Sequence, residues 1–264
     1  MRISFIYFYK YLKLNNYFED SVFLPGEKKS NRTPLMSEAV RKLFTEISPT
    51  YDRLNHLLSL NIDKLWRKKT IARIQKKSDE RFQALDLCCG TFDLSLECVK
   101  QFPNAKIQAI DFSQSMIEVG KKKIQDFPQI IPLCGDALNL SFKNKTFDVI
   151  FCGFGIRNLD DVEKGLKEMY RVLKPHGQVL ILEFFKPTSS LQKLFHKTYG
   201  AHVLPKIGRF ISGNPKAYSY LKDSIQGFLT VPEFCELLQK NGFENISAKD
   251  YFLKISSCIN AFCK

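Results

Sequence analysis

The chain has 264 residues and a formal net charge of +13 at pH 7, with 44% hydrophobic and 25% charged residues. This balance is ordinary for a globular protein, and the length suits one α/β domain with additions. No apolar run approaches the ~20 residues of a membrane-spanning helix, and we predict no signal peptide at the aromatic-rich N-terminus. The eight cysteines lack metal-ligand spacing, so we expect mostly buried thiols, a reducing compartment and no bound metal.

Helical patterns precede the first strand. We interpret residues 1–35 as an N-terminal extension without fixed structure, or as an interfacial aromatic segment. Apolar residues recur at helical spacing from Glu38 to Ile47, where Ser48-Pro49 ends the helix, and again over roughly 52–74. We therefore expect residues 36–264 to form one domain in which a helical cap, 36–80, covers a ligand.

Strands and helices then alternate, which indicates a parallel sheet covered on both faces. Helices are predicted at 161–173 and 232–240, where apolar residues recur at spacings of three and four. The last two strand candidates are joined by a short connection and predict an antiparallel hairpin at one edge. The predicted strands are 82–88, 106–112, 130–134, 147–153, 178–185, 244–250 and 255–263.

The most informative stretch is Leu85-Asp86-Leu87-Cys88-Cys89-Gly90-Thr91, in which an apolar strand enters a tight turn; Asp111 ends the next strand. Open α/β sheets bind nucleosides across the carboxyl ends of their strands, where a carboxylate accepts hydrogen bonds from ribose. The glycine triplet of dinucleotide sites is absent, and Asp86 would repel a pyrophosphate. The turn favours a cationic ligand such as S-adenosylmethionine, while another nucleotide or no ligand stays open on the pattern alone.

Between Glu183 and Asp223 there are seven basic residues and no acidic one, and aromatic residues alternate with them. Such a segment suits nucleic acid, through phosphate contacts and stacking. It also suits an anionic membrane surface or a plain solvated face. Composition alone does not separate these three readings.

Further motifs follow in chain order, and together they resemble the ubiquinone/menaquinone biosynthesis C-methyltransferase family (the UbiE/MenG type) from about residue 37 to the end. The resemblance implies the class I S-adenosylmethionine-dependent methyltransferase fold, an α/β fold with a seven-stranded, mostly parallel sheet, an antiparallel edge hairpin and an N-terminal helical cap. The motifs are Tyr51-Asp52-Arg53-Leu54-Asn55, the turn above, Asp111-Phe112-Ser113-Gln114-Ser115-Met116, Gly135-Asp136-Ala137, Phe154-Gly155-Ile156-Arg157-Asn158, Arg171-Val172-Leu173-Lys174-Pro175, Leu182-Glu183-Phe184, His202-Val203-Leu204-Pro205 and Tyr218-Ser219-Tyr220-Leu221.

The resemblance also implies S-adenosyl-L-methionine as methyl donor, with no metal. The acceptor would be a ring carbon of a polyprenylated quinol, demethylmenaquinol or a benzoquinol precursor of ubiquinone, and the sequence does not say which. A helix N-cap explains Thr91 equally well, and an ordinary turn residue explains Asp136. The implied cofactor-binding residues are Asp86, Gly90, Thr91, Asp111, Met116, Asp136 and Ala137.

A quinol ring carbon becomes nucleophilic when its hydroxyl ionises, and a phenol has a pKa of about 10, so a nearby cation or base must help. We expect Arg157 to stabilise the phenolate, because a guanidinium stays charged, with Asn158 as a hydrogen-bonding neighbour. The structural alternative is an ion pair between Arg157 and a cap carboxylate such as Asp52. Candidates for the proton's destination are Tyr51, Asp52, Tyr199 and His202.

Because the acceptor's prenyl tail resides in the bilayer, the basic and aromatic segment, 184–222, is reinterpreted as a substrate and membrane segment. We then expect a cytoplasmic protein, peripheral at the inner face of an anionic membrane, with no nucleic-acid partner. A homodimer stays open.

Two departures from the family pattern keep alternatives open. Phe92 stands where the family has glycine, so its side chain must either point away or crowd the methionine end of the cofactor. The stretch His196-Lys197-Thr198-Tyr199 lacks a carboxylate that the family tends to have. One alternative is a non-catalytic methyltransferase-fold protein that binds membranes or a quinone-pathway complex; another is an enzyme with a sterol or phospholipid acceptor.

Overall fold

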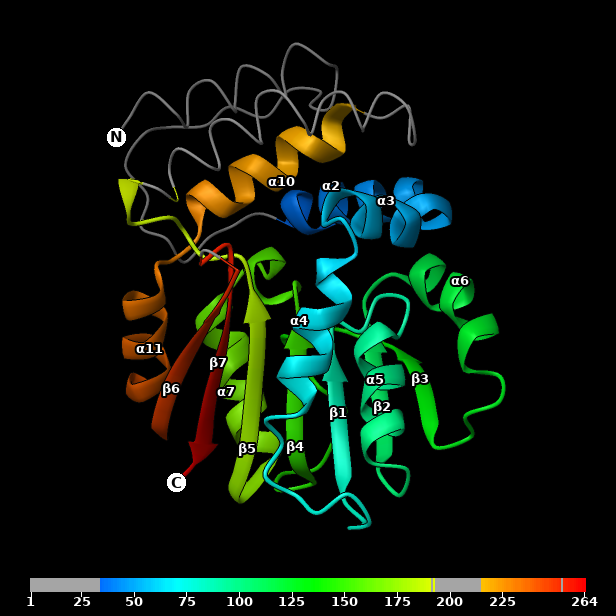
Figure 1. Ribbon diagram of the computed structural model, residues 1–264, viewed down its shortest axis with the longest axis vertical. Coiled ribbons are helices and arrows are strands. Elements are labelled where there is room, and N and C mark those ends of the chain that lie inside the picture. Colours follow the sequence, from blue (N-terminus) through cyan, green and yellow to red (C-terminus); the bar gives the residue numbers. More distant parts are fainter. Residues whose placement is uncertain (1–33, 191, 193–214, 253) are drawn as a thin grey trace. The chain divides into compact units, whose positions relative to one another are not determined.

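The computed structural model describes residues 34–190, 192, 215–252 and 254–264 (Figure 1). By its internal contacts the chain divides into two compact units, Met1–Pro34 and Leu35–Lys264. All described strands lie in the second unit. Among the described residues, no helix is both long and apolar enough to cross a membrane.

A seven-stranded sheet in the order β3-β2-β1-β4-β5-β7-β6 forms the centre of the second unit. Neighbours among β1 to β5 pair in parallel, whereas β7 is antiparallel to both β5 and β6. The predicted sheet and its edge hairpin are therefore confirmed. The strands are β1 (Gln83–Leu87), β2 (Lys106–Asp111), β3 (Ile130–Cys134), β4 (Phe147–Gly153), β5 (Leu173–Glu183), β6 (Phe243–Tyr251) and β7 (Ser256–Cys263).

Helices cover both faces of the sheet, as the alternation of strands and helices predicts. In Figure 1, α4 and α5 lie in front of the strands and α7 lies behind them. Two hydrophobic cores result, one containing Trp66 of α4 with Val99 of α5, the other containing Leu166 of α7 with Leu238 of α11. The helices are α2 (Pro34–Ile47), α3 (Tyr51–Leu58), α4 (Ile62–Ile71), α5 (Asp93–Gln101), α6 (Gln114–Ile124), α7 (Val162–Val172), α10 (Pro215–Gly227) and α11 (Val231–Lys240), with 3-10 turns η1 (Ser48–Thr50) and η2 (Ile156–Asn158).

The single helix predicted over 52–74 is wrong, because two helices, α3 and α4, occupy this stretch. Leu60 and Asn61 both adopt left-handed backbone angles, with φ of 52° and 61°. The amide of Asn61 donates to the carbonyl of His56 at 2.7 Å, a bond that closes the end of a helix. Apolar residues keep their helical spacing across the break, so periodicity could not reveal it.

Strand β5 begins at Leu173, five residues before the predicted start. Leu173 pairs with Phe147 of β4, and the register then shifts so that Val149 pairs with Gln178. The residues between, which include Pro175, form an irregularity in the strand. Proline is tolerated there because it lacks the amide that a regular ladder requires.

The expectation of mostly buried thiols is correct; the exceptions are Cys88 and Cys235, which are half-buried, and Cys134. All eight cysteines are free, and five of them are buried. Cys134 is exposed, contrary to its assignment to an apolar run. It ends β3, the edge strand, which has a neighbour on one side only.

Phe92 is fully buried in the core that α4 and α5 share. Its backbone is left-handed, with φ of 69°, and its ring faces Gly120 of α6, where an added Cβ would lie 2.5 Å from the ring. The Phe92 ring therefore packs into the core against α6. Gly120 is the position that makes room for it.

Gly120→Ala should therefore destabilise the protein. The new methyl group would lie 2.5 Å from the Phe92 ring and 2.9 Å from the Thr91 Cα, and relief requires movement of the backbone. We expect a loss of about 1–3 kcal/mol in the free energy of unfolding, measured by urea denaturation. Gly227→Ala is the matched control, since nothing lies within 4 Å of its added Cβ; an equal effect of both changes would contradict the packing described.

Candidate active site

The sequence-predicted residues gather where the parallel strands end. Asp86 lies near the end of β1 and Asp111 ends β2; Glu183, which was not among the predicted site residues, ends β5. The helix α3 approaches from the cap, because a Cβ built on Gly90 would lie 3.9 Å from Cε1 of Tyr51. Parallel strands bring their carboxyl ends to one edge of the sheet, which is where open α/β folds bind ligands.

The turn after β1 is tied to β2 by backbone donors. Gly90, with φ of 54°, donates its amide to Oδ2 of Asp111 at 2.8 Å, and Ser113 donates its amide to Oδ1 at 2.9 Å. Burial raises the pKa of Asp111, and these two amides act in the opposite direction. The carboxylate is thereby fixed beside the turn.

Asp86 is 1% exposed, and only one of its two carboxylate oxygens has hydrogen-bond partners. Its Oδ2 accepts hydrogen bonds from the amide of Ser95 at 3.0 Å and from the Ser95 hydroxyl at 2.6 Å. Its Oδ1 has no partner in the described part of the chain, and burial raises the pKa of this carboxyl to about 7. An unsatisfied buried acceptor costs roughly 1–3 kcal/mol, so this oxygen is suited to a ligand that carries N–H donors or positive charge.

Thr91 and Asp52 form a hydrogen bond with each other. The Thr91 hydroxyl donates to Oδ1 of Asp52 at 2.5 Å, and Nζ of Lys123 lies 2.9 Å from the other Asp52 oxygen. Lys123 also donates to the Thr91 hydroxyl at 3.2 Å and pairs with Asp93. Thr91 is not the N-cap of α5, because Phe92 occupies that position. The cap, the turn and α6 are joined here.

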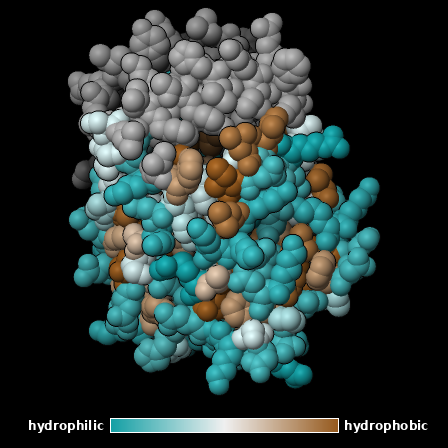
Figure 2. Space-filling view, viewed as in Figure 1, coloured by the Kyte–Doolittle hydropathy of each residue, from teal (hydrophilic) through white to brown (hydrophobic). Residues whose placement is uncertain are grey.

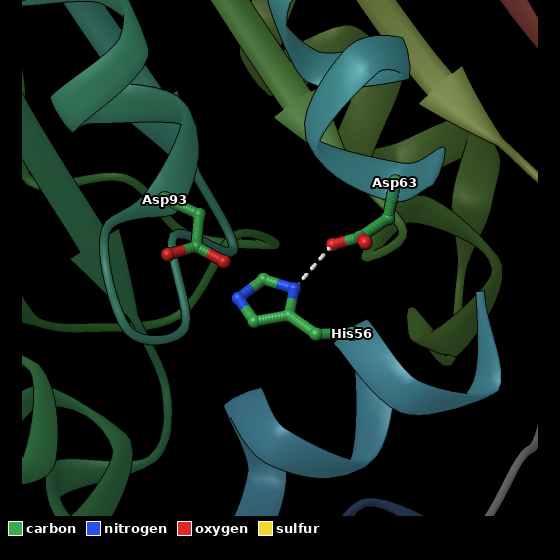
Figure 3. Close-up of side chains that lie close together, drawn as sticks. All are labelled: His56, Asp63 and Asp93. Atoms are coloured by element: carbon green, nitrogen blue, oxygen red, sulfur yellow. Dashed lines mark hydrogen bonds and ion pairs between the residues drawn. The ribbon is translucent and has the colours of Figure 1, made fainter. Parts of the chain in front are cut away.

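His56, Asp63 and Asp93 converge beside that junction, with the imidazole between the two carboxylates (Figure 3). Nδ1 of His56 lies 2.8 Å from Oδ2 of Asp63. Two cations already face the carboxylates: Arg67 pairs with Asp63 and lies 3.6 Å from Asp93, and Lys123 pairs with Asp93. Burial opposes ionisation of both acids, but Arg67 lowers the pKa of each. We interpret this cluster as a fastening of α3 and α4 to α5.

Arg157 pairs with Glu183, not with Asp52 as the structural alternative supposed. Its Nη1 donates to Oε1 of Glu183 at 2.5 Å and to the Phe154 carbonyl at 2.9 Å, and its Nε donates to the Ser224 hydroxyl at 3.3 Å. Nη2 has no hydrogen-bond partner among the residues that the structure describes, so two N–H donors stay available there. Burial raises the pKa of Glu183, and Arg157 counteracts this.

A stacked aromatic pair separates the two buried arginines. The ring centres of Phe154 and Phe184 lie 4.6 Å apart, and the ring planes are inclined by 29°. The guanidinium of Arg67 lies 5.5 Å from the Phe154 ring centre, and that of Arg157 lies 5.8 Å from the Phe184 ring centre. These cation–π contacts hold Arg157 in orientation beyond its ion pair.

Asn158 and Tyr51 complete the described part of the site. Oδ1 of Asn158 accepts a hydrogen bond from the Tyr220 hydroxyl of α10 at 2.9 Å. Phe44 of α2 lies edge-on to both Tyr220 and Tyr51, with ring centres 6.4 and 6.1 Å away. Burial raises the pKa of Tyr51, which suits this phenol to donating a hydrogen bond rather than taking up a proton.

The positions of the remaining predicted residues say less about ligand binding. Met116 is buried beside Ile47, and Ala137 is buried in the hydrophobic core that contains Leu166 of α7. The Asp136 carboxylate accepts a hydrogen bond from the amide of Leu138 at 2.8 Å, as a turn residue does. Tyr199 and His202 lie outside the described residues. Lys123, Ser95 and the pairing role of Glu183 were not predicted; Lys123 belongs to a run of three lysines in which no pattern singles it out.

Solved structures place this geometry in a known fold. The chain superposes on a methyltransferase of Thermotoga maritima described as S-adenosylmethionine-dependent, with a TM-score of 0.59, 19% identity and coverage of 84% of this chain and 99% of that one. A phosphoethanolamine N-methyltransferase of Haemonchus contortus, solved with S-adenosyl-L-methionine, gives a TM-score of 0.58 at 15% identity over 75% of this chain and 52% of that one. The fold is that of class I methyltransferases.

Sequence comparison then gives the family. The model of the ubiE/COQ5 methyltransferase family matches residues 32–260, and the chain belongs to this family. A demethylmenaquinone methyltransferase of Lactobacillus johnsonii is 38% identical over 221 residues, 82% of this chain and 88% of its own. One of Listeria monocytogenes is 35% identical over 219 residues, 81% of this chain and 91% of its own.

Lys123→Met should loosen the cap from the turn. The change removes the ammonium that bridges Asp52, Thr91 and Asp93, and because these groups are partly solvated we expect the cost to be about 1 kcal/mol. Amide hydrogen exchange in α3 should quicken while exchange in the strands is unchanged. Lys121→Met is the matched control, since among the described residues Lys121 pairs with Glu118 of its own helix and with no other; equal exchange in both variants would contradict the bridging role.

Proposed function

We propose that the protein transfers the methyl group of S-adenosyl-L-methionine to a ring carbon of a polyprenylated quinol, converting demethylmenaquinol to menaquinol. The observation that carries this proposal is the similarity to demethylmenaquinone methyltransferases over more than four fifths of this chain and of theirs. The strand-end geometry supports it independently, since it offers acidic groups at β1 and β2 and a cation after β4.

The residues of the first turn fit this cofactor. The unsatisfied oxygen of buried Asp86 would receive its ammonium group, and Asp111 would hold the ribose hydroxyls beside Gly90. When bound, the cofactor supplies a methyl group activated by a positively charged sulfur. We assign Thr91 and Met116 to the same site, with Asp136 and Ala137 beside the adenine. The buried Phe92 ring gives no support to the alternative in which it blocks the cofactor.

On the acceptor side, Arg157 would hydrogen-bond the ring oxygen. The Nη2 donors that no described residue uses can stabilise the negative charge that develops as the hydroxyl ionises. Asn158 and Tyr51 would orient the ring, while Glu183 fixes the guanidinium. The bonds of Asp52 to Thr91 and Lys123 favour an anchoring role over a proton-accepting one. Tyr199 and His202 stay candidates for the proton's destination.

The polyprenyl tail also bears on where the enzyme works. We propose a cytoplasmic protein that contacts the inner face of an anionic membrane peripherally. In this proposal residues 36–264 form one methyltransferase domain, which includes the cap 36–80 and the substrate and membrane segment 184–222, and residues 1–35 form an extension. Nucleic acid has no place in this reaction. A homodimer is compatible with it and is not required by any described contact.

The direct test supplies the purified full chain with S-adenosylmethionine and demethylmenaquinol under reducing conditions. We expect one methyl group to appear on the ring, detected by mass spectrometry, and no product when the quinone is left oxidised, because the ring is then not nucleophilic. Failure to methylate any reduced quinone, while S-adenosylhomocysteine binds, would overturn the acceptor assignment.

Removing the Arg157 charge should slow turnover without weakening cofactor binding. Arg157→Ala would strand buried Glu183 without its partner and cost about 3–5 kcal/mol, so the double change Arg157→Met with Glu183→Gln is the sharper test. We expect kcat to fall about 10²–10³-fold, with affinity for S-adenosylhomocysteine unchanged by calorimetry. Arg171→Ala, which breaks the pair with Glu168 on α7, is the control and should leave kcat intact. Equal losses of turnover and cofactor affinity would show that Arg157 is misplaced.

A further inference from the structure

The hairpin of α3 and α4 exposes three leucines to solvent. Leu57 is 42% exposed, Leu60 71% and Leu65 48%, and these are three of the five large hydrophobic side chains that stand out as exposed in the described part of the chain. Figure 2 shows hydrophobic surface over α4 and the turn that precedes it. Exposed leucines gathered on one hairpin differ from the scattered single residues that any surface carries.

The exposed charged residues of α3 and α4 are all basic. Arg53, Lys64, Lys68 and Lys69 are exposed along with the leucines. The acidic residues of the two helices face inward: Asp63 is buried against Arg67, and Asp52 pairs with Lys123. We call the seven exposed residues the leucine–lysine face: Arg53, Leu57, Leu60, Lys64, Leu65, Lys68 and Lys69.

The tip of this face is held in an unusual backbone conformation. Leu60 has φ of 52°, at a helix end where glycine is the preferred residue. Amides of Leu60, Asn61 and Ile62 all donate to carbonyls of the preceding turn, between 2.7 and 3.1 Å. The chain therefore keeps a large apolar side chain, 71% exposed, at a position where its backbone geometry is disfavoured.

We propose that the leucine–lysine face is the surface with which the protein docks on an anionic bilayer, the three leucines entering the headgroup boundary and the four basic residues meeting lipid phosphates. Apolar side chains flanked by Lys and Arg bind such interfaces without a spanning helix. This rests on the proposed function in one respect, that the acceptor's tail resides in the bilayer. Tyr51 and Asp52 begin α3 beside the turn that follows β1. Docking would therefore bring the cap to the bilayer, where the acceptor resides.

Charge argues against the other occupants of this face. A second copy joined by a two-fold axis would set the face against itself and bring like charges together. Single-stranded nucleic acid would require aromatic side chains for stacking, but Trp66, the aromatic residue of α4, is buried. An anionic lipid surface satisfies both the leucines and the basic residues.

The test measures sedimentation of the full chain with vesicles of equal parts phosphatidylglycerol and phosphatidylcholine, and with phosphatidylcholine alone. We expect binding to the anionic vesicles, weakened about fivefold for each lysine removed in Lys64→Gln and Lys68→Gln. Leu60→Gly should also weaken binding, and because glycine suits the left-handed backbone it should not reduce stability. The matched controls are Ile131→Ser on β3 and Lys122→Gln on α6, which should bind as the unaltered chain does.

The outcomes separate docking from catalysis, which is followed with a short-chain, water-soluble demethylated quinol. Variants of the face should keep turnover with this acceptor while losing vesicle binding. Vesicle binding that is unaffected by the face variants, or affected equally by the controls, overturns the proposal. So does concentration-dependent dimerisation that Leu60→Gly abolishes. Absent turnover with intact, face-dependent vesicle binding would instead overturn the proposed function and leave the docking surface standing.

Discussion

The site depends on a buried carboxylate, that of Asp86, in which only one of the two oxygens has a hydrogen-bond partner among the described residues. Asp86 sits in a sheet core, Ser95 satisfies one of its oxygens, and the other has no partner among the described residues. A protein gains nothing in stability from such a group, and its raised pKa records the cost of keeping it charged. In the proposed function, the ammonium group of the bound cofactor would supply the missing partner.

Electrostatic sign divides the site into two halves. In the proposed function, Asp86 and Asp111, at the carboxyl ends of β1 and β2, would offer negative charge to a cationic cofactor, whereas Arg157, after β4, would offer positive charge to an acceptor that becomes an anion. Each half is held by its own network. Lys123 fastens the cap to the cofactor turn, and Glu183 with Phe184 fixes the guanidinium. The parallel register of β1 and β4 sets the two halves side by side.

The sequence predicts what depends on local pattern. Strands β3 and β4 lie where apolar runs place them. Asp86, Gly90 and Asp111 lie close together because they stand near the carboxyl ends of neighbouring parallel strands or in the turn that follows. What it misses depends on contacts between distant residues. Nothing in the Lys121-Lys122-Lys123 run marks the third lysine as the one that reaches Asp52, and no spacing pairs Arg157 with a carboxylate 26 residues away. The sequence did not predict the helix break at Leu60, because the left-handed backbone conformation found there is ordinarily adopted by glycine.

The central claim is that Asp86 binds the cofactor's positive charge, and the pH dependence of cofactor affinity tests it most directly. The pKa of Asp86 is raised to about 7, so below that pH the carboxyl is neutral and binding of a cation must first ionise it. Affinity for S-adenosylmethionine should therefore rise with pH, by up to tenfold per unit between about pH 5 and 7. In Asp86→Asn, affinity should be weaker and this slope absent. Equal affinity of the two proteins, or a wild-type affinity that does not change across this range, would contradict the account.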